Sequence, residues 1–217
     1  MEKTRTIRTW GSFLLLLLLL FVFLIWNVLA GSVKLPVSEI LEILRGRGDG
    51  TQSRILLQIR LPRLLSALIL GGALSVSGYL LQTFFHNPIA GPFVLGISSG
   101  AKLCVSIVMI LLLSRGLVSS SAALIAAAFV GAMGSMGFVL AVSQKVKRMS
   151  LLVICGVMIG YICTAATDLL VTFADDSNIV NLHNWSMGSF SGMSWENVGT
   201  MAIVCGAALV LVFFLSK

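Results

Sequence analysis

Charged residues are scarce in this chain. Of its 217 residues only 11% are Asp, Glu, Lys or Arg, whereas a soluble domain carries about a quarter. Hydrophobic residues make up 58% of the sequence, and the mean hydropathy is +1.03. This composition excludes a separate soluble domain. It predicts an all-α fold, a polytopic bundle of membrane helices in which residues 1–217 form a single transmembrane domain.

Residues that hold metals or catalyse reactions are also few. The two histidines, His86 and His183, lie in unlike settings and form no H-x-x-x-H pair, so we predict no metal site. The sequence has no G-x-S-x-G, H-E-x-x-H or Walker A motif, so we expect no catalytic residue, no bound nucleotide and no cofactor. The four cysteines lie in apolar runs without a C-x-x-C, which favours reduced thiols buried as small hydrophobic side chains.

Six apolar runs are long enough to cross a membrane, which takes about 20 residues. They cover about residues 11–30, 61–85, 93–114, 122–142, 151–173 and 196–216. A cleaved signal peptide is the alternative for the first run, because residues 28–30 are an acceptable cleavage site. The length of that run and the polytopic chain after it favour a signal anchor.

The connecting segments differ in character. Residues 38–44 predict a short amphipathic helix lying on the membrane, capped by Ser38 and ended by the glycines from Gly46 onward. Residues 115–121 predict a tight connection, and the polar residues 174–195 predict a short surface helix.

The net charge of +7 comes from basic residues at the ends of apolar runs, which indicates contact with lipid and not with nucleic acid. Lys145, Lys147 and Arg148 form the clearest cytoplasmic marker. With six spans, both termini are expected in the cytoplasm of a bacterial cell, and residues 31–60 and 174–195 outside it.

Irregular backbone is expected at residues 86–92, between the second and third apolar runs. Two prolines and a glycine there end one helix before the next begins. Backbone of this kind is tolerated at membrane depth only where it packs in protein or lines a water-filled path. Small residues that let membrane helices approach closely lie at helical spacing in the second span, at Gly71, Gly72, Ser75 and Gly78, and in the fifth span, at Gly156 and Gly160.

Several short motifs follow one another from residue 60. They are RLPR at 60–63, G-A-L-x-x-S-G at 72–78, Leu-Gln at 81–82, N-P-I-A-x-P at 87–92 and L-G-I-S-S-G-A at 95–101. Together they resemble the FecCD-like permeases, the membrane subunits of ATP-binding cassette (ABC) importers for iron-siderophore, haem and vitamin B12. The resemblance continues more weakly through residues 152–160 and 185–196, and covers about the first six of the ten helices of such permeases.

The resemblance implies a transport subunit and not an enzyme. Such a permease pairs with a second permease, is driven by cytoplasmic ABC ATPases that hydrolyse the ATP, and receives its solute from an extracytoplasmic binding protein. The first choice of solute is a ferric siderophore, and haem or cobalamin is the alternative. A non-transporting, truncated membrane scaffold is a further alternative.

The resemblance also assigns site residues. Arg60 and Arg63 would face outward and dock the binding protein. Asn87, Pro88 and Ile89 would form one element of a cytoplasmic gate, and Met149 and Ser150 the other. Family permeases continue beyond their sixth span with a loop that seats in the ATPase, so we expect this chain to be a fragment or a truncated product that cannot run the transport cycle alone.

Overall fold

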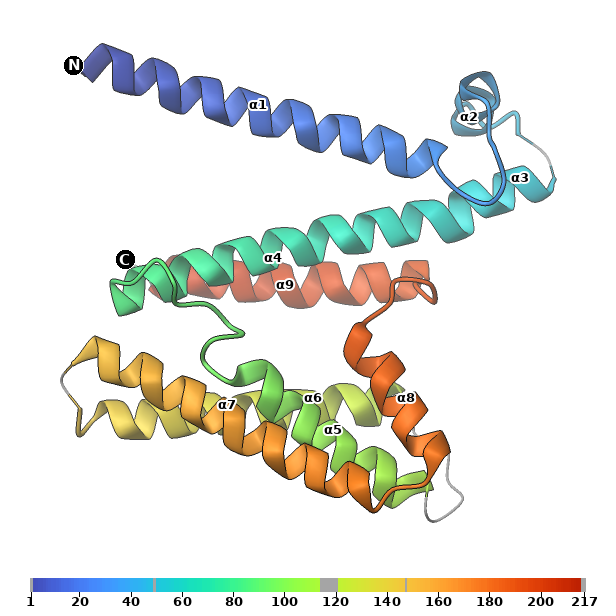
Figure 1. Cartoon of the computed structure of the whole chain (residues 1–217). Coiled ribbons are helices and arrows are strands. Elements are labelled where there is room, and N and C mark those ends of the chain that lie inside the picture. The colour runs from blue at the N-terminus through green and yellow to red at the C-terminus, as the bar shows by residue number, and fades with distance from the viewer. Residues whose placement is uncertain (1, 49, 114–120, 147, 216–217) are drawn as a thin grey trace. The chain divides into compact units, whose positions relative to one another are not determined.

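The computed structural model describes residues 2–48, 50–113, 121–146 and 148–215, and these are helical apart from turns and connections (Figure 1). In chain order the elements are α1 (Glu2–Leu29), α2 (Val37–Leu44), α3 (Thr51–Arg54), the π-helical η1 (Ile55–Arg60), α4 (Leu61–Phe85), α5 (Ile97–Leu113), α6 (Ser121–Ser143), α7 (Met149–Thr172), α8 (Asp176–Met187) and α9 (Trp195–Leu215). The chain divides into two compact units, Met1–Ala73 with Phe190–Lys217, and Leu74–Ser189.

Five helical stretches within the described residues are long and apolar enough to cross a membrane. They are Thr6–Leu29, Thr51–Phe85, Ala122–Ser143, Ser150–Thr172 and Trp195–Leu215. They match the first, second, fourth, fifth and sixth predicted runs, which confirms a polytopic, all-helical membrane protein.

Three predicted spans have different bounds in the structure. The first was expected over residues 11–30, but the apolar helical stretch covers Thr6–Leu29. The second was expected to begin at residue 61, but the helical stretch begins at Thr51 and is 35 residues long. The third was expected over residues 93–114, but α5 begins only at Ile97 and has 17 residues, a length of about 26 Å. Residues 92–96 are turns instead, and Gly96 at φ +71° takes a left-handed conformation before the helix starts.

In the first unit a small core joins the end of α1 to α2 and η1. Leu35, Ile40, Ile43 and Leu56 are its buried members. The predicted amphipathic helix is confirmed as α2, but the cap at Ser38 is wrong. The helix begins one residue earlier, and Pro36 stands at its N-cap position with φ −65° and no side-chain hydrogen bond.

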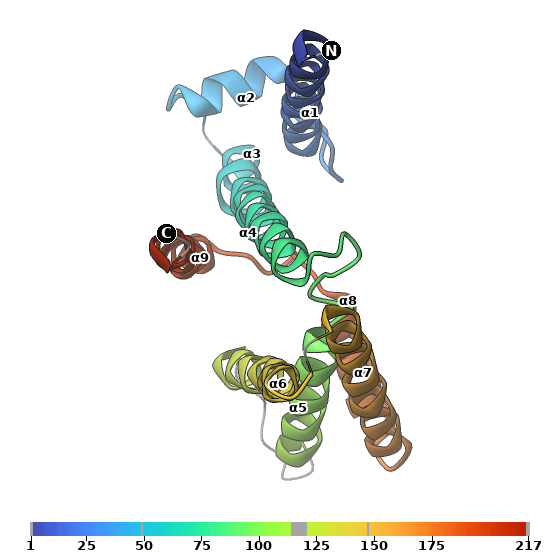
Figure 2. The ribbon, with the colours of Figure 1, turned by 90° about the vertical axis from the view of Figure 1, so that its left-hand side faces the viewer.

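In the second unit α5 packs against both α6 and α7 (Figure 2). One core cluster joins the turn after α4 to α6 and α7 through Phe85, Ala90, Leu95, Val139 and Leu152. A second cluster joins α5, α6 and α8 through Val105, Met109, Ala127 and Leu182. The helix predicted within residues 174–195 is confirmed as α8, whereas its place on the membrane surface stays a prediction. The tight connection expected at residues 115–121 lies outside the described residues, except for Ser121 at the start of α6.

Glycines bring the backbones of α5, α6 and α7 together. A Cβ on Gly100 of α5 would lie 2.6 Å from the carbonyl oxygen of Gly131 of α6. A Cβ on Gly156 of α7 would lie 2.8 Å from the Cα of Leu95, and one on Gly96 would lie 2.8 Å from the nitrogen of Gly160. These contacts are main chain to main chain, so only glycine permits the observed separations.

Candidate gate and docking elements

The turn between α4 and α5 is fixed by side-chain hydrogen bonds. The Ile89 N–H donates to Asn87 Oδ1 at 3.0 Å, and Gln82 Nε2 donates to the Pro88 carbonyl at 3.0 Å. The first is an Asx turn, in which asparagine accepts a hydrogen bond from the main chain two residues on. His86 begins the turn at φ +48°, in the left-handed region.

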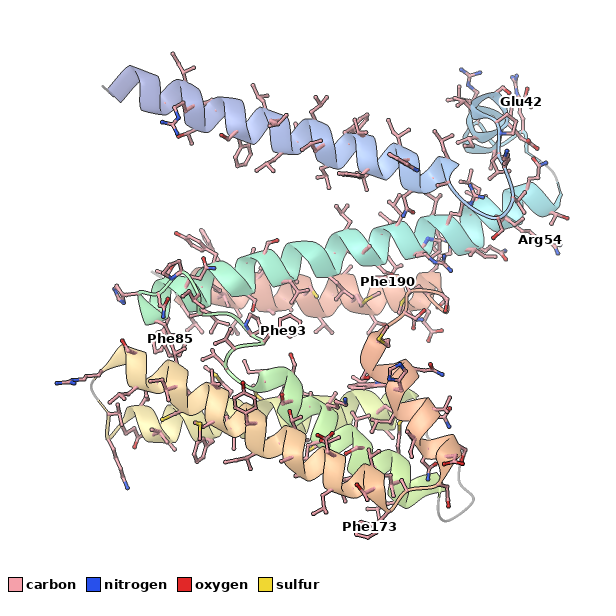
Figure 3. The ribbon with its side chains drawn as sticks, viewed as in Figure 1. Glu42, Arg54, Phe85, Phe93, Phe173 and Phe190 are labelled. Atoms are coloured by element: carbon pink, nitrogen blue, oxygen red, sulfur yellow. The ribbon has the colours of Figure 1, made fainter. Side chains whose placement is uncertain are left out.

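This turn has one buried side and one exposed side. Phe85 and Ala90 are buried, whereas Ile89 and Phe93 are 73% and 75% exposed. Figure 3 shows Phe85 at the end of α4 and Phe93 in the chain that follows. The packing of Phe85 and Ala90 therefore holds the exposed Ile89 in a defined position.

The start of α7 packs in the same cluster as the turn. Leu152 of α7 is buried with Phe85 and Ala90, and Ser150 is exposed. Residues next to the two predicted gate elements therefore share one core cluster, but Asn87, Pro88, Ile89 and Ser150 are not members of it, and the gate stays a prediction. The side chain of Met149 and the whole of Lys147 lie outside the described residues.

The two arginines predicted to dock a binding protein have different surroundings. Arg60 is only 8% exposed, and its Nη1 donates to the Val28 carbonyl at 2.5 Å and to the Leu29 carbonyl at 3.3 Å. Its Nη2 donates to the Val33 carbonyl. Arg63 is partly exposed, and its Nε makes a long contact of 3.4 Å with the carbonyl of Phe190, which Figure 3 labels before α9.

A cavity of about 360 Å³ lies beside these arginines. It is lined by Asn27, Ala30, Gly31, Ser32, Val33, Ile55, Ile59, Arg60 and Arg63. Arg60 and Arg63 both line it, together with residues from the end of α1 and from η1.

The predicted packing residues also divide into two sets. Gly156 and Gly160 lie against Leu95 and Gly96. On α4, a Cβ built at Gly71, Gly72 or Gly78 would meet no atom within 4 Å among the described residues, so their packing role remains a prediction.

Sequence reasoning missed four glycines that matter for packing. Gly96 and Gly100 were noted only as part of a motif, and Gly31 and Gly131 were assigned no role. The spacing of four residues between Gly96 and Gly100 was a usable signal, because it matches the small-residue pattern of closely packed helix pairs. Among the described residues, no three His, Cys, Asp or Glu side chains gather as metal ligands would.

These features define a class of protein: a polytopic helical membrane protein with a proline-containing break between two of its helices. The sequence profile of the FecCD transport family matches residues 17–217, and the chain belongs to that family.

The chain is similar to curated relatives and to a solved structure. It is 35% identical over 199 residues to the vitamin B12 import system permease protein BtuC of Klebsiella pneumoniae, covering 92% of this chain and 56% of the relative. It is 35% identical over 145 residues to the hemin transport system permease protein HmuU of Yersinia pestis, covering 66% and 43%. A putative metal-chelate type ABC transporter in an inward-facing conformation matches with a TM-score of 0.75 and 27% identity, covering 93% of this chain and 60% of that one. The chain thus spans about half the length of the curated relatives it matches.

Proposed function

We propose that this chain belongs to a permease subunit of a binding-protein-dependent ABC importer. The observation that carries the proposal is the family match over residues 17–217. The chain itself would catalyse no reaction, because ATP hydrolysis would belong to a separate cytoplasmic subunit. Its partners would be a second permease, the ATPase and an extracytoplasmic binding protein.

The proposed solute is a large metal chelate. Relatives of this chain are named for hemin and vitamin B12, each a metal held in a large organic ring, and the solved neighbour is named as a putative metal-chelate type transporter. We propose a ferric siderophore as the first candidate, with haem and cobalamin as the alternatives.

Uptake into vesicles tests both statements. The permease is reconstituted with its ATPase and binding protein, and ATP-dependent entry of a labelled ferric siderophore, haem and cobalamin is measured in parallel. We expect uptake of one chelate and competition by its own unlabelled form. Vesicles with an ATPase that cannot hydrolyse ATP are the control. Equal, ATP-independent entry of all three would contradict the proposal.

We further propose that the turn at residues 87–89 and the start of α7 form the gate. Apolar and small polar side chains close a membrane path by packing and excluding water. Ile89 is exposed and Ser150 stands near the start of α7, so each could meet its counterpart in a second permease. Single cysteines at Ile89 or Ser150 should cross-link between two permeases in one nucleotide state. Phe93→Cys, equally exposed in the same connection, is the matched control.

A further inference from the structure

Arg60 is a buried cation whose hydrogen-bond acceptors are main-chain carbonyls. Two of them, at Val28 and Leu29, belong to the last turn of α1, and the third, at Val33, follows it. The last carbonyls of a helix have no partner within the helix and carry its negative dipole end. A guanidinium at this place satisfies those carbonyls and is itself stabilised by them, which a buried charge requires.

Gly31 provides the space that the guanidinium occupies. A Cβ built on Gly31 would lie 2.8 Å from Arg60 Cζ and 3.2 Å from Nε, and closer still to Nη2. The backbone of Gly31 is not in the left-handed region, so glycine is needed here for space and not for conformation. The chain leaving α1 is therefore shaped around the Arg60 side chain.

Pro62 explains why the Leu57 carbonyl accepts a hydrogen bond from a side chain. In η1 the Leu61 N–H bonds to the Leu56 carbonyl, five residues back. The same pattern would pair the Leu57 carbonyl with residue 62, which is proline and has no N–H. Trp195 supplies the missing donor, because its Nε1 donates to the Leu57 carbonyl at 2.9 Å.

We propose that residues 60–63 are an internal junction and not a pair of equivalent docking charges. Arg60 holds the end of α1, and Pro62 frees the Leu57 carbonyl for Trp195 at the start of α9. Arg63 is then the cation of the RLPR motif that contacts the binding protein. The proposed junction does not depend on the proposed function, whereas the role of Arg63 in docking rests on it.

A double-mutant cycle on thermal unfolding of the purified chain tests the junction. Gly31→Ala should lower the midpoint temperature of thermal unfolding by roughly 4 °C or more, because the added Cβ would displace the Arg60 guanidinium. In an Arg60→Ala background the same substitution should change it little, because the side chain that it would strike is gone. Gly11→Ala is the control: an added Cβ there meets no atom within 4 Å in the described part of the chain, so the substitution should not lower the midpoint. Simple addition of the Gly31 and Arg60 effects would overturn the junction.

A conservative substitution separates the junction from docking. Arg60→Lys keeps the charge but loses the planar fork whose two terminal nitrogens reach different carbonyls, so it should lower the midpoint nearly as much as Arg60→Gln. Arg63→Gln should leave the midpoint unchanged and reduce the salt dependence of binding-protein association, which neither Arg60 variant should do.

The outcomes distinguish the two proposals. Suppose that Arg60→Gln lowers both the thermal midpoint and the salt dependence of association, and that Arg60→Lys restores both. Arg60 would then act through its charge, and the junction would be wrong. Absence of association even with the unchanged permease would count against the proposed function, while the thermal cycle would still decide on the junction.

Discussion

The crossing of α5 and α6 predicts opposite effects for two glycines on the same helix. A Cβ at Gly131 would lie 2.7 Å from the carbonyl carbon of Gly100 and 3.0 Å from the Cα of Ala101, and closer still to the Gly100 oxygen. These are main-chain atoms, so they cannot turn aside as a flexible side chain would. At Gly134, three residues further along α6, an added Cβ would meet nothing within 4 Å among the described residues.

The expected magnitudes follow from this difference. Overpacking costs about 1–3 kcal/mol, and a clash between two backbones belongs near the upper end of that range. Alanine favours a helix over glycine by about 1 kcal/mol. Gly131→Ala should therefore lower the free energy of unfolding by about 2 kcal/mol, and Gly134→Ala should raise it by up to about 1 kcal/mol. The two variants should differ by roughly 100-fold in their unfolding equilibrium constants.

The assay measures the reversible unfolding of the chain in lipid bicelles, with steric trapping as the method that reports the unfolding equilibrium constant. Gly137→Ala is a second control on α6, because its added Cβ also meets no atom of the described residues within 4 Å. If Gly131→Ala proved as stable as Gly134→Ala, α5 and α6 could not cross as closely as the structure shows.

Three further predictions concern other parts of the chain. Trp195→Phe should lower the thermal midpoint, and less so in a Pro62→Ala background, where the main chain regains a donor; equal losses would refute the π-helical explanation. Asn87→Ala should cost about 1 kcal/mol in thermal unfolding, whereas Asn87→Asp keeps an acceptor for the Ile89 N–H and should cost less. A single cysteine at Val146 should be labelled by an impermeant thiol reagent only from the cytoplasmic side, and strong external labelling would reverse the proposed topology.

The spans could be predicted because hydropathy is a local property of the sequence. The break at residues 86–92 was equally visible, since proline acts on its own helix turn. The start of the second helix was missed because Arg54, Gln58 and Arg60 lower the hydropathy of residues 51–60. Helix propagation depends instead on main-chain hydrogen bonds, and long basic side chains at a helix end can reach polar surroundings.

The environment of Arg60 could not be predicted from its neighbours in sequence. Arg60 and Arg63 are the same residue type one helical turn apart, a spacing that places two side chains on one face. Their difference arises from the end of α1, which lies about thirty residues earlier and brings its carbonyls to Arg60 alone. Side chains on a shared face need not share a role when another helix ends against one of them.

This difference leads to a prediction for other proteins with the same motif. The Arg60 guanidinium occupies space that exists because residue 31 has no side chain. A family member with a larger residue at the position of Gly31 should therefore be unable to bury the corresponding arginine, and that side chain should turn outward and be open to a partner. Comparing the exposure of this arginine in structures with and without glycine at that position is the measurement. A buried arginine beside a bulky residue would show that the chain after α1 can move away, and that glycine is not what admits the side chain.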